Sequence, residues 1–334
     1  MNLADWLQSR WYDEKPPLGL VPLSGLFRGI VALRRMAYRR GWKQARRLPV
    51  PVVVVGNLSV GGTGKTPLAI WLVEFLKASG YKPGVVSRGY GGRKQAKPLA
   101  VTADSDPAEA GDEPVLIARR TACPVYVFPR RFEAGRALLS DNDCDILIAD
   151  DGLQHYALAR DVEIAVVDGG RRFGNGQCLP AGPLREPAGR LAEVDLVVCR
   201  GAPRPGEFGM ALACGEAVNL ADPSIKKPLA DFIGVKLRAI AGIGHPQRFF
   251  AELRAAGLSF EERAFPDHHR FGPEDLGPDD GAQIVMTEKD AVKCRGFANG
   301  RLWAVPLRAQ LPPAFGETVL QLLKKVKPDG QKAA

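Results

Sequence analysis

A glycine-rich turn at residues 59–66 (Ser-Val-Gly-Gly-Thr-Gly-Lys-Thr) constrains the fold more than any other part of the sequence. It follows a β-branched run at 52–55 and precedes a mostly apolar helical stretch at 67–79. Glycines in this setting let backbone N–H groups converge on phosphate oxygens, and the following helix directs its positive end at them. The strand, turn and helix therefore predict a P-loop, although Ser59 stands where the usual pattern has its first glycine.

The residues of this turn have separate expected roles. The ammonium of Lys65 would bridge the β- and γ-phosphates of a nucleotide, which makes it a catalytic candidate, and the hydroxyl of Thr66 would hold Mg²⁺. The expected nucleotide-binding residues are Ser59, Val60, Gly61, Gly62, Thr63, Gly64, Lys65 and Thr66.

Two carboxylates end a second hydrophobic run, where Asp150 and Asp151 follow Ile-Leu-Ile-Ala. In open parallel sheets ligands bind at the carboxyl ends of the strands. One carboxylate is expected to organise Mg²⁺ and the other to steer metal or substrate, so the metal candidates are Thr66, Asp150 and Asp151. The alternative is an acidic turn that closes a strand.

Short apolar runs recur along the chain between helical stretches and polar loops. This alternation predicts an α/β fold, a P-loop NTPase-like and mainly parallel sheet covered by helices, with a second, smaller α/β domain. The clearest linker is the Gly- and Pro-rich stretch 201–209. The predicted parts are a basic N-terminal segment at 1–47, a P-loop domain at 48–209 and a second α/β domain at 210–327.

Composition excludes several classes of protein. With 46% hydrophobic and 25% charged residues the chain is not broadly disordered. It has no run of about 18 uncharged apolar residues, so we expect no transmembrane helix, and no signal peptide is expected either. The six cysteines form no CxxC pair, which favours reduced thiols over a disulfide framework or a zinc site.

The positive charge is concentrated at the N-terminus. Residues 1–47 carry ten Lys and Arg against three Asp and Glu, so they hold +7 of the total +9. A helical pattern at 24–40 gathers apolar side chains on one face and arginines opposite or beside it, namely Leu26, Ile30, Leu33 and Ala37 against Arg28, Arg35 and Arg39, with Arg34 and Arg40 on the flanks. This face either lies in an anionic membrane surface or packs on the protein's own core.

Two other nucleotide-binding classes fit less well. Partitioning-type ATPases would have a lysine at position 60, which is Val60. The stretch 287–290 (Thr-Glu-Lys-Asp) has Lys and Asp out of register for a guanine-reading motif, and we expect it only to begin a helix. The turn at 242–246 is likewise expected to be a plain strand–helix connection.

The motifs together resemble the tetraacyldisaccharide 4′-kinase family, the lipid A 4′-kinases. The matching stretches are colinear and lie at 55–67, 87–91 (Ser-Arg-Gly-Tyr-Gly), 111–114 (Gly-Asp-Glu-Pro), 150–155 (Asp-Asp-Gly-Leu-Gln-His), 182–186 (Gly-Pro-Leu-Arg-Glu), 265–269 (Phe-Pro-Asp-His-His) and 287–290. The basic amphipathic N-terminus also fits the family.

The resemblance implies a reaction in which Mg·ATP phosphorylates the 4′-hydroxyl of a tetraacylated glucosamine disaccharide 1-phosphate. It implies a peripheral enzyme on the cytoplasmic face of the bacterial inner membrane, whose partners are this lipid and an anionic membrane surface. We expect no nucleic-acid partner and a monomer. The alternatives are a soluble P-loop kinase for a small metabolite and a nucleotide-dependent membrane adaptor without enzymatic activity.

The resemblance also implies an Asp–His pair that activates the acceptor hydroxyl. The aspartate corresponds to Asp112 and the histidine to His268, whereas His269 is the less favoured base. Asp112 is expected in the P-loop domain and His268 in the second domain, so domain closure would complete the catalytic set and exclude water.

An anionic substrate needs cations and hydrogen-bonding groups around it. Arg88, Arg131 and Arg185 are candidates for binding its 1-phosphate or the phosphates of ATP, with surface ion pairs as the alternative. Tyr90, Gln154 and His155 are candidates for binding sugar hydroxyls or the headgroup.

Overall fold

The computed structural model describes residues 7, 10–13 and 15–326, and the chain divides into two compact units. Unit 1 comprises Met1–Arg88, Phe128–Ala211 and Leu311–Ala334, and unit 2 comprises Gly89–Val127 and Leu212–Gln310. The predicted segments 1–47 and 210–327 both reach residues outside this description. The division differs from the predicted one chiefly because residues 89–127 belong with the second unit instead of the P-loop.

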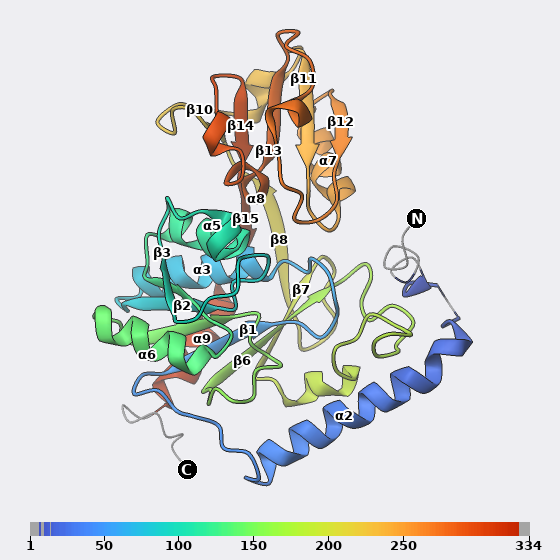
Figure 1. Ribbon diagram of the computed structural model, residues 1–334, viewed down its shortest axis with the longest axis vertical. Helices are drawn as coiled ribbons and strands as arrows, with labels where there is room; N and C mark the ends of the chain where they lie inside the picture. The colour runs from blue at the N-terminus through green and yellow to red at the C-terminus, as the bar shows by residue number, and fades with distance from the viewer. Residues whose placement is uncertain (1–6, 8–9, 14, 327–334) are drawn as a thin grey trace. The chain divides into compact units, whose positions relative to one another are not determined.

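Unit 1 is built on a parallel sheet with the strand order β8-β7-β6-β1-β5-β2 (Figure 1). Every pairing within this order is parallel. The register places Val55 of β1 opposite Asp150 of β5, so the two motifs predicted for the sheet edge follow neighbouring strands. The strands are β1 (Val52–Gly56), β2 (Pro83–Ser87), β5 (Ile146–Asp150), β6 (Val162–Asp168), β7 (Leu196–Arg200) and β8 (Phe208–Cys214).

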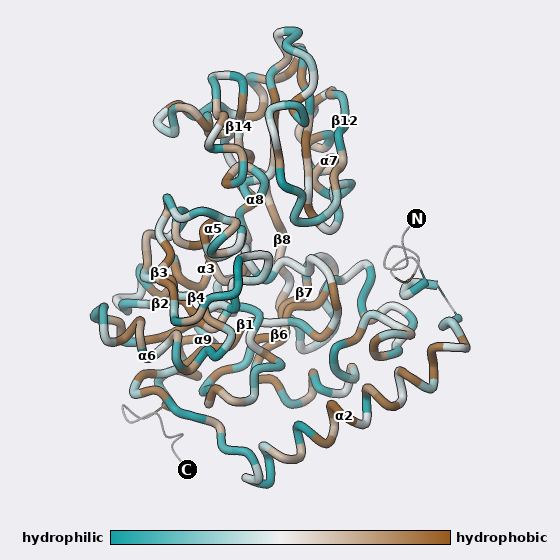
Figure 2. The backbone as a smooth tube through the Cα atoms, in the orientation of Figure 1, coloured by the Kyte–Doolittle hydropathy of each residue, from teal (hydrophilic) through white to brown (hydrophobic). Residues whose placement is uncertain are grey.

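The core of unit 1 follows from its unbroken apolar strands. The four valines at 52–55 are at most 1% exposed, as expected for a strand covered on both faces. The hydropathy colouring in Figure 2 shows the same inner strands in brown. Phe315 is fully buried, with its ring 5.4 Å from that of Trp71. The covering helices are α3 (Lys65–Ala78), α6 (Arg131–Asp141) and α9 (Pro313–Lys324).

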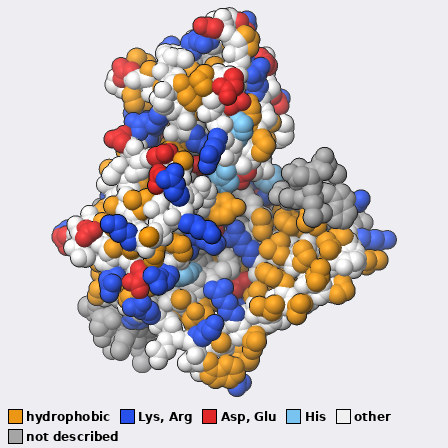
Figure 3. All heavy atoms as spheres, in the orientation of Figure 1, with side chains coloured by type: hydrophobic (Ala, Val, Ile, Leu, Met, Phe, Trp, Pro, Cys, Tyr) orange, Lys and Arg blue, Asp and Glu red, His pale blue; other side chains and the backbone are white. Residues whose placement is uncertain are grey.

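Helix α2 (Val21–Arg39) follows the short helix η1 (Leu18–Leu20) and belongs to unit 1. Its predicted apolar face is turned away from the rest of that unit. Leu26, Ile30 and Leu33 are 58–63% exposed, and Figure 3 shows hydrophobic side chains gathered over this helix. The protein-facing side carries Ser24, whose hydroxyl donates to the carbonyl of Cys178 at 2.7 Å. The alternative in which the stripe packs on the protein's own core is therefore wrong for these three residues.

The helical pattern is wrong for Ala37. Ala37 is buried, although the helical pattern grouped it with the apolar stripe. Arg35 and Arg39 both form ion pairs with Glu193 of η2 (Ala188–Glu193), and these pairs connect α2 to η2. Among the described residues no helix is long and apolar enough to cross a membrane.

Unit 2 holds a six-stranded sheet in the order β10-β9-β14-β13-β11-β12, in which β14, β13, β11 and β12 are parallel. Phe249 and Phe250 of α7 (Pro246–Ala255) are buried in its core. The strands are β9 (Ala217–Asn219), β10 (Lys226–Lys227), β11 (Leu237–Ala241), β12 (Glu261–Ala264), β13 (Gln283–Thr287) and β14 (Leu302–Val305), with β15 (Leu307–Gln310) after them. The short helices are η3 (Leu229–Phe232), η4 (Pro273–Leu276), α8 (Glu288–Ala291) and η5 (Arg295–Phe297).

Residues 89–127 add a further piece to unit 2. They form the antiparallel strands β3 (Leu99–Val101) and β4 (Val125–Val127) with helices α4 (Pro107–Ala110) and α5 (Asp112–Thr121). Arg120 of α5 pairs with Glu288 of α8 at 2.7 Å, and both side chains are largely buried. This ion pair joins the two sequence segments of the unit.

Two modest expectations are confirmed in unit 2. The segment 242–246 is a plain connection from β11 to α7. Thr287 is the N-cap of α8, because its side chain accepts a hydrogen bond from the backbone N–H of Asp290.

Candidate active site

The phosphate-binding turn of unit 1 has the backbone that a P-loop requires. Gly64, the N-cap of α3, has a φ of 99°, a conformation that favours glycine. Lys65 and Thr66 therefore begin the helix, where free backbone N–H groups and the helix dipole favour anions. Ser59 is 6% exposed and Val60 donates its N–H to the carbonyl of Pro183 at 2.8 Å, so the turn is held at its start.

Asn57 organises this turn, although the sequence interpretation gave it no role. Its amide donates to the hydroxyl of Thr63 at 3.1 Å, and its Oδ1 accepts from Lys65 Nζ at 3.2 Å. Asn57 is fully buried, so these bonds are shielded from water. The lysine is thereby held at the turn with its ammonium satisfied.

Asp151 lies among cations at the end of β5. Its two carboxylate oxygens lie 2.9 and 3.0 Å from Arg185 Nη1, and one of them lies 3.6 Å from Lys65 Nζ. Burial opposes its ionisation, but the charges of Lys65, Arg185 and Arg131 lower the pKa of Asp151 to about 2. Its φ of 47° is uncommon for a residue other than glycine and often marks functional sites.

Mg²⁺ binding is tested by the donors at this strand end. Asp150 is fully buried beside Val55, and Thr66 is 9% exposed at the start of α3. No cluster of three or more His, Cys, Asp or Glu suited to a metal occurs in the described part of the chain. Carboxylate and hydroxyl oxygens such as those of Asp150 and Thr66 are suitable donors for a magnesium ion that also binds nucleotide phosphates.

Arg131 and His155 also belong to unit 1. Arg131 begins α6, is 5% exposed, and donates to the carbonyl of Asp151 at 3.2 Å. Burial lowers its pKa to about 10, against the raising effect of Asp151. Burial and the charges of Arg131 and Arg160 lower the pKa of His155 to about 4, so its imidazole is neutral near pH 7. The charge of Arg88 contributes to both shifts.

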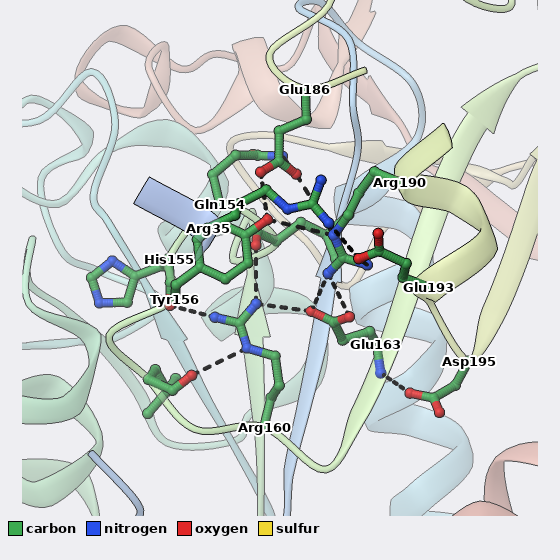
Figure 4. A network of polar contacts seen from close by, with 12 residues as sticks. Arg35, Gln154, His155, Tyr156, Arg160, Glu163, Glu186, Arg190, Glu193 and Asp195 are labelled. Atoms are coloured by element: carbon green, nitrogen blue, oxygen red, sulfur yellow. Dashed lines mark hydrogen bonds and ion pairs between the residues drawn. The ribbon is translucent and has the colours of Figure 1, made fainter. Parts of the chain in front are cut away.

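Gln154 connects the turn to a polar network, which Figure 4 shows. Its amide donates to the carbonyl of Asn57 at 3.1 Å and to Glu186 at 3.4 Å. Glu186 is 1% exposed and accepts from the Tyr156 hydroxyl. Arg190 contacts this hydroxyl and pairs with Glu163, and it lies 3.8 Å from Glu193, the partner of α2.

The predicted Asp–His pair lies wholly within unit 2. His268 Nδ1 and Asp112 Oδ2 are 3.0 Å apart, and the side chains are 26% and 9% exposed. Asp112 begins α5 immediately after Gly111, whose φ of 91° and close approach to the carbonyl of Tyr90 exclude a side chain. The Tyr90 ring lies 5.2 Å from that of His268 and is 65% exposed, so it is available to a substrate.

The expectation that Asp112 belongs to the P-loop domain is wrong. Both residues belong to unit 2, because residues 89–127 join that unit. The pair is therefore formed before any movement of one unit against the other. His269 is engaged elsewhere, with its Nε2 2.9 Å from Asp275 Oδ2.

Asp112 also lies near two lysines that the sequence interpretation did not include. Burial alone would raise the pKa of Asp112, but the hydrogen bond with His268 and the charges of Lys293 and Lys289 hold it below its usual value. Lys289 lies in the Thr-Glu-Lys-Asp stretch, for which the sequence predicts only the start of a helix, and Lys293 follows that stretch by three residues. Spacing alone gave no sign that this stretch faces α5.

Known proteins are similar over almost the whole chain. The family model described as tetraacyldisaccharide-1-P 4′-kinase matches residues 17–324. A tetraacyldisaccharide 4′-kinase of Nitrosococcus oceani is 54% identical over 316 residues, which cover 94% of this chain and 93% of the relative. One of Stenotrophomonas maltophilia is 51% identical over 330 residues, covering 96% and 97%.

A solved structure is similar in fold. It is described as the "apo" form of LpxK from Aquifex aeolicus in complex with ATP, and it matches with a TM-score of 0.78 at 28% identity. The match covers 91% of this chain and 98% of that one. With the P-loop, the Asp112–His268 pair and these matches, the chain belongs to the tetraacyldisaccharide 4′-kinase family.

Proposed function

We propose that this chain transfers the γ-phosphoryl group of ATP to the 4′-hydroxyl of a tetraacylated glucosamine disaccharide 1-phosphate, with Asp112 and His268 as the acceptor-activating pair. Family membership supports the reaction. The 3.0 Å contact between His268 Nδ1 and Asp112 Oδ2 is the observation that carries the assignment of the base.

The phosphate-binding turn would hold the nucleotide. Backbone N–H groups at 59–66 and the start of α3 face the phosphates, and Lys65 neutralises charge on the transferring group. Lys65 Nζ contacts Asn57 Oδ1 and Asp151 Oδ1, and the γ-phosphate would take the place of one of these partners. Mg²⁺, held by Thr66 and by Asp150 or Asp151, would supply further charge neutralisation for the phosphates.

His268 would take the proton of the 4′-hydroxyl. Its Nδ1 is occupied by Asp112, which leaves Nε2 as the accepting nitrogen. The carboxylate orients the ring and stabilises the imidazolium that forms, as in other base–carboxylate pairs. The hydroxyl oxygen then bonds to the γ-phosphorus, and the bond to the β-phosphate oxygen breaks to release ADP. The turn belongs to unit 1 and the base to unit 2, so this step uses residues of both units.

The substrate's own charge would be matched by arginines. Arg88, Arg131 and Arg185 are the candidates for its 1-phosphate or for the phosphates of ATP. Arg185 and Arg131 both contact Asp151, whose carboxylate also lies near Lys65 of the phosphate-binding turn. We therefore favour the phosphates of ATP over the 1-phosphate of the lipid as the ligand of these two arginines. Tyr90, Gln154 and the neutral His155 would contact sugar hydroxyls.

The membrane would be engaged by α2. Its exposed Leu26, Ile30 and Leu33 form an apolar face, and Arg28 and Arg34 are exposed beside it. Such a helix can lie in the plane of an interface without crossing it. This supports a peripheral enzyme at the cytoplasmic face of the inner membrane, where a monomer would suffice because lipid covers the apolar face of α2.

The experiment that tests the function is transfer of labelled phosphate from ATP to a purified acceptor. The tetraacyldisaccharide 1-phosphate in mixed micelles should be labelled, whereas an analogue lacking the 4′-hydroxyl should not. Labelling of small soluble sugars at equal rate would favour the small-metabolite kinase. Stable ATP binding without transfer to either acceptor would favour the adaptor.

A further inference from the structure

Two further charged side chains of unit 2, those of Lys293 and Asp290, lie close to Asp112. Lys293, which follows α8, has its Nζ 3.7 Å from Asp112 Oδ2 and 2.8 Å from Asp290 Oδ1. The side chain of Lys293 is 8% exposed, that of Asp112 is 9% exposed, and that of Asp290 is fully buried. Water therefore screens these charges weakly.

Asp290 fixes the position of Lys293. Its Oδ2 accepts the N–H of Gly242 at 2.9 Å and the hydroxyl of Thr287 at 2.7 Å, which leaves Oδ1 for the lysine. The Lys293 ammonium also lies 5.0 Å from the centre of the Phe271 ring. Because the Asp290 carboxylate and the Phe271 ring both lie next to it, the ammonium has a defined place beside Asp112.

We propose that Lys293 is a positioning residue for the reaction: its ammonium holds the carboxylate of Asp112 against His268 and offsets part of its negative charge there. This inference rests on the proposed role of His268 as the base. A carboxylate beside a histidine favours the imidazolium, which has no lone pair for the substrate proton. A buried cation next to the same carboxylate oxygen, Asp112 Oδ2, limits this effect and keeps the imidazole available as a base.

Other charged groups face the pair from the neighbouring elements. Asp267 Oδ2 lies 3.8 Å from His268 Nε2, and Lys289 Nζ lies 3.2 Å from Asp267 Oδ1 and 3.5 Å from Glu113 Oε1. Lys289 thus has two carboxylates of its own and is 17% exposed. We therefore assign the main effect to Lys293 and expect a smaller one from Lys289.

The test is the pH titration of the His268 ring, followed by NMR in the full chain. The protein has four histidines, so the His268 signal is identified by its loss in His268→Asn. In Lys293→Met the midpoint should move to higher pH by about 0.5–1 unit, because the imidazolium loses a nearby cation. The acidic limb of kcat/KM should move in the same direction.

Three further variants complete the test. Lys293→Arg should restore both midpoints, because it keeps the charge. Lys236→Met is the matched control in the same unit: this lysine is 64% exposed and pairs with Asp280, and its loss should change neither midpoint. If Lys293→Met does not fold, because Asp290 is left unpaired, the double variant Lys293→Met/Asp290→Asn removes the whole ion pair and should give the same upward shift.

The outcomes separate this inference from the proposed function. An unchanged or lowered midpoint of the His268 titration, in whichever of these variants folds, would overturn the role of Lys293. An acidic limb that persists in His268→Asn would instead overturn His268 as the base, whatever the lysine variants do.

Discussion

The turn region of unit 1 and the Asp112–His268 pair of unit 2 both place a carboxylate among cations, but the cations differ in kind. Asp151 is bound by Arg185 and Lys65, which stay charged over the working pH range. Asp112 is bound by a histidine, a side chain that can both accept and give up a proton in catalysis. The first arrangement suits an anionic ligand and the second suits proton transfer, so the two units carry different parts of the reaction.

The largest effect should come from the turn. Lys65→Ala removes the cation that contacts the transferring phosphoryl group, and we expect kcat to fall by about 10³–10⁵-fold. Lys77→Ala, an exposed lysine at the other end of α3, is the matched control and should retain activity. A folded Lys65→Ala enzyme with near-normal kcat would contradict the assignment of phosphate chemistry to unit 1.

The next effect should come from the pair. His268→Gln and Asp112→Asn should each lower kcat by about 10²–10⁴-fold, the usual range for a general base, while ATP binding is retained. Because the residues act as one unit, the double variant should be little worse than the poorer single one. Multiplicative losses would mean that Asp112 serves another step. His269→Gln should be mild, since His269 is bound to Asp275.

How far the sequence predicts these regions depends on how their residues are distributed. The turn is contiguous, so Lys65 and Thr66 could be assigned from local spacing. Asp112 and His268 are 156 positions apart, and the resemblance to a family paired them. The motifs gave no sign that residues 89–127 join unit 2, because this depends on tertiary contacts such as the Arg120–Glu288 ion pair.

Helix α2 shows a second limit of the same kind. Helical periodicity separates an apolar face from a basic face, but it does not say which face turns to the protein. That choice rests on Glu193, which pairs with Arg35 and Arg39 from a distant part of the chain. The same reason explains why the sequence does not assign Lys293, because Asp112 comes near it only in the folded chain. Asn57 is different: its partners Thr63 and Lys65 are close in sequence, but the turn that brings them together is set by the fold.

A third prediction separates membrane binding from catalysis. Leu26→Gln/Ile30→Gln should weaken binding to vesicles containing anionic lipid by about 10²-fold, since burying each apolar side chain contributes roughly 1.5 kcal/mol or more. The acidic limb of kcat/KM should not move. Ile225→Gln, a change at an exposed isoleucine in unit 2, is the control. Unchanged vesicle binding in the double variant would remove α2 from the proposal.

The smallest effect concerns stability. The pKa of Asp151 is lowered to about 2, so its contribution is present above the usual carboxyl pKa and is lost as the pH falls through about 2. Asp151→Asn should lower the free energy of unfolding at pH 7, because the ion pairs of this carboxylate are lost. We expect a loss of only about 1–2 kcal/mol, because the side chain is partly open to solvent, which weakens these pairs. Urea denaturation without nucleotide should show this difference shrinking from about pH 5 to pH 2. A constant difference would mean that the ion pairs contribute nothing.

The ion pairs between α2 and Glu193 have a practical consequence for handling the protein. They hold Arg35 and Arg39 to Glu193, while Leu26, Ile30 and Leu33 on another side of the helix face solvent. In dilute buffer such a surface favours self-association between copies, which detergent or lipid would reverse. Size-exclusion chromatography should therefore give larger particles without detergent than with it, and Leu26→Gln/Ile30→Gln should elute as a single species in both.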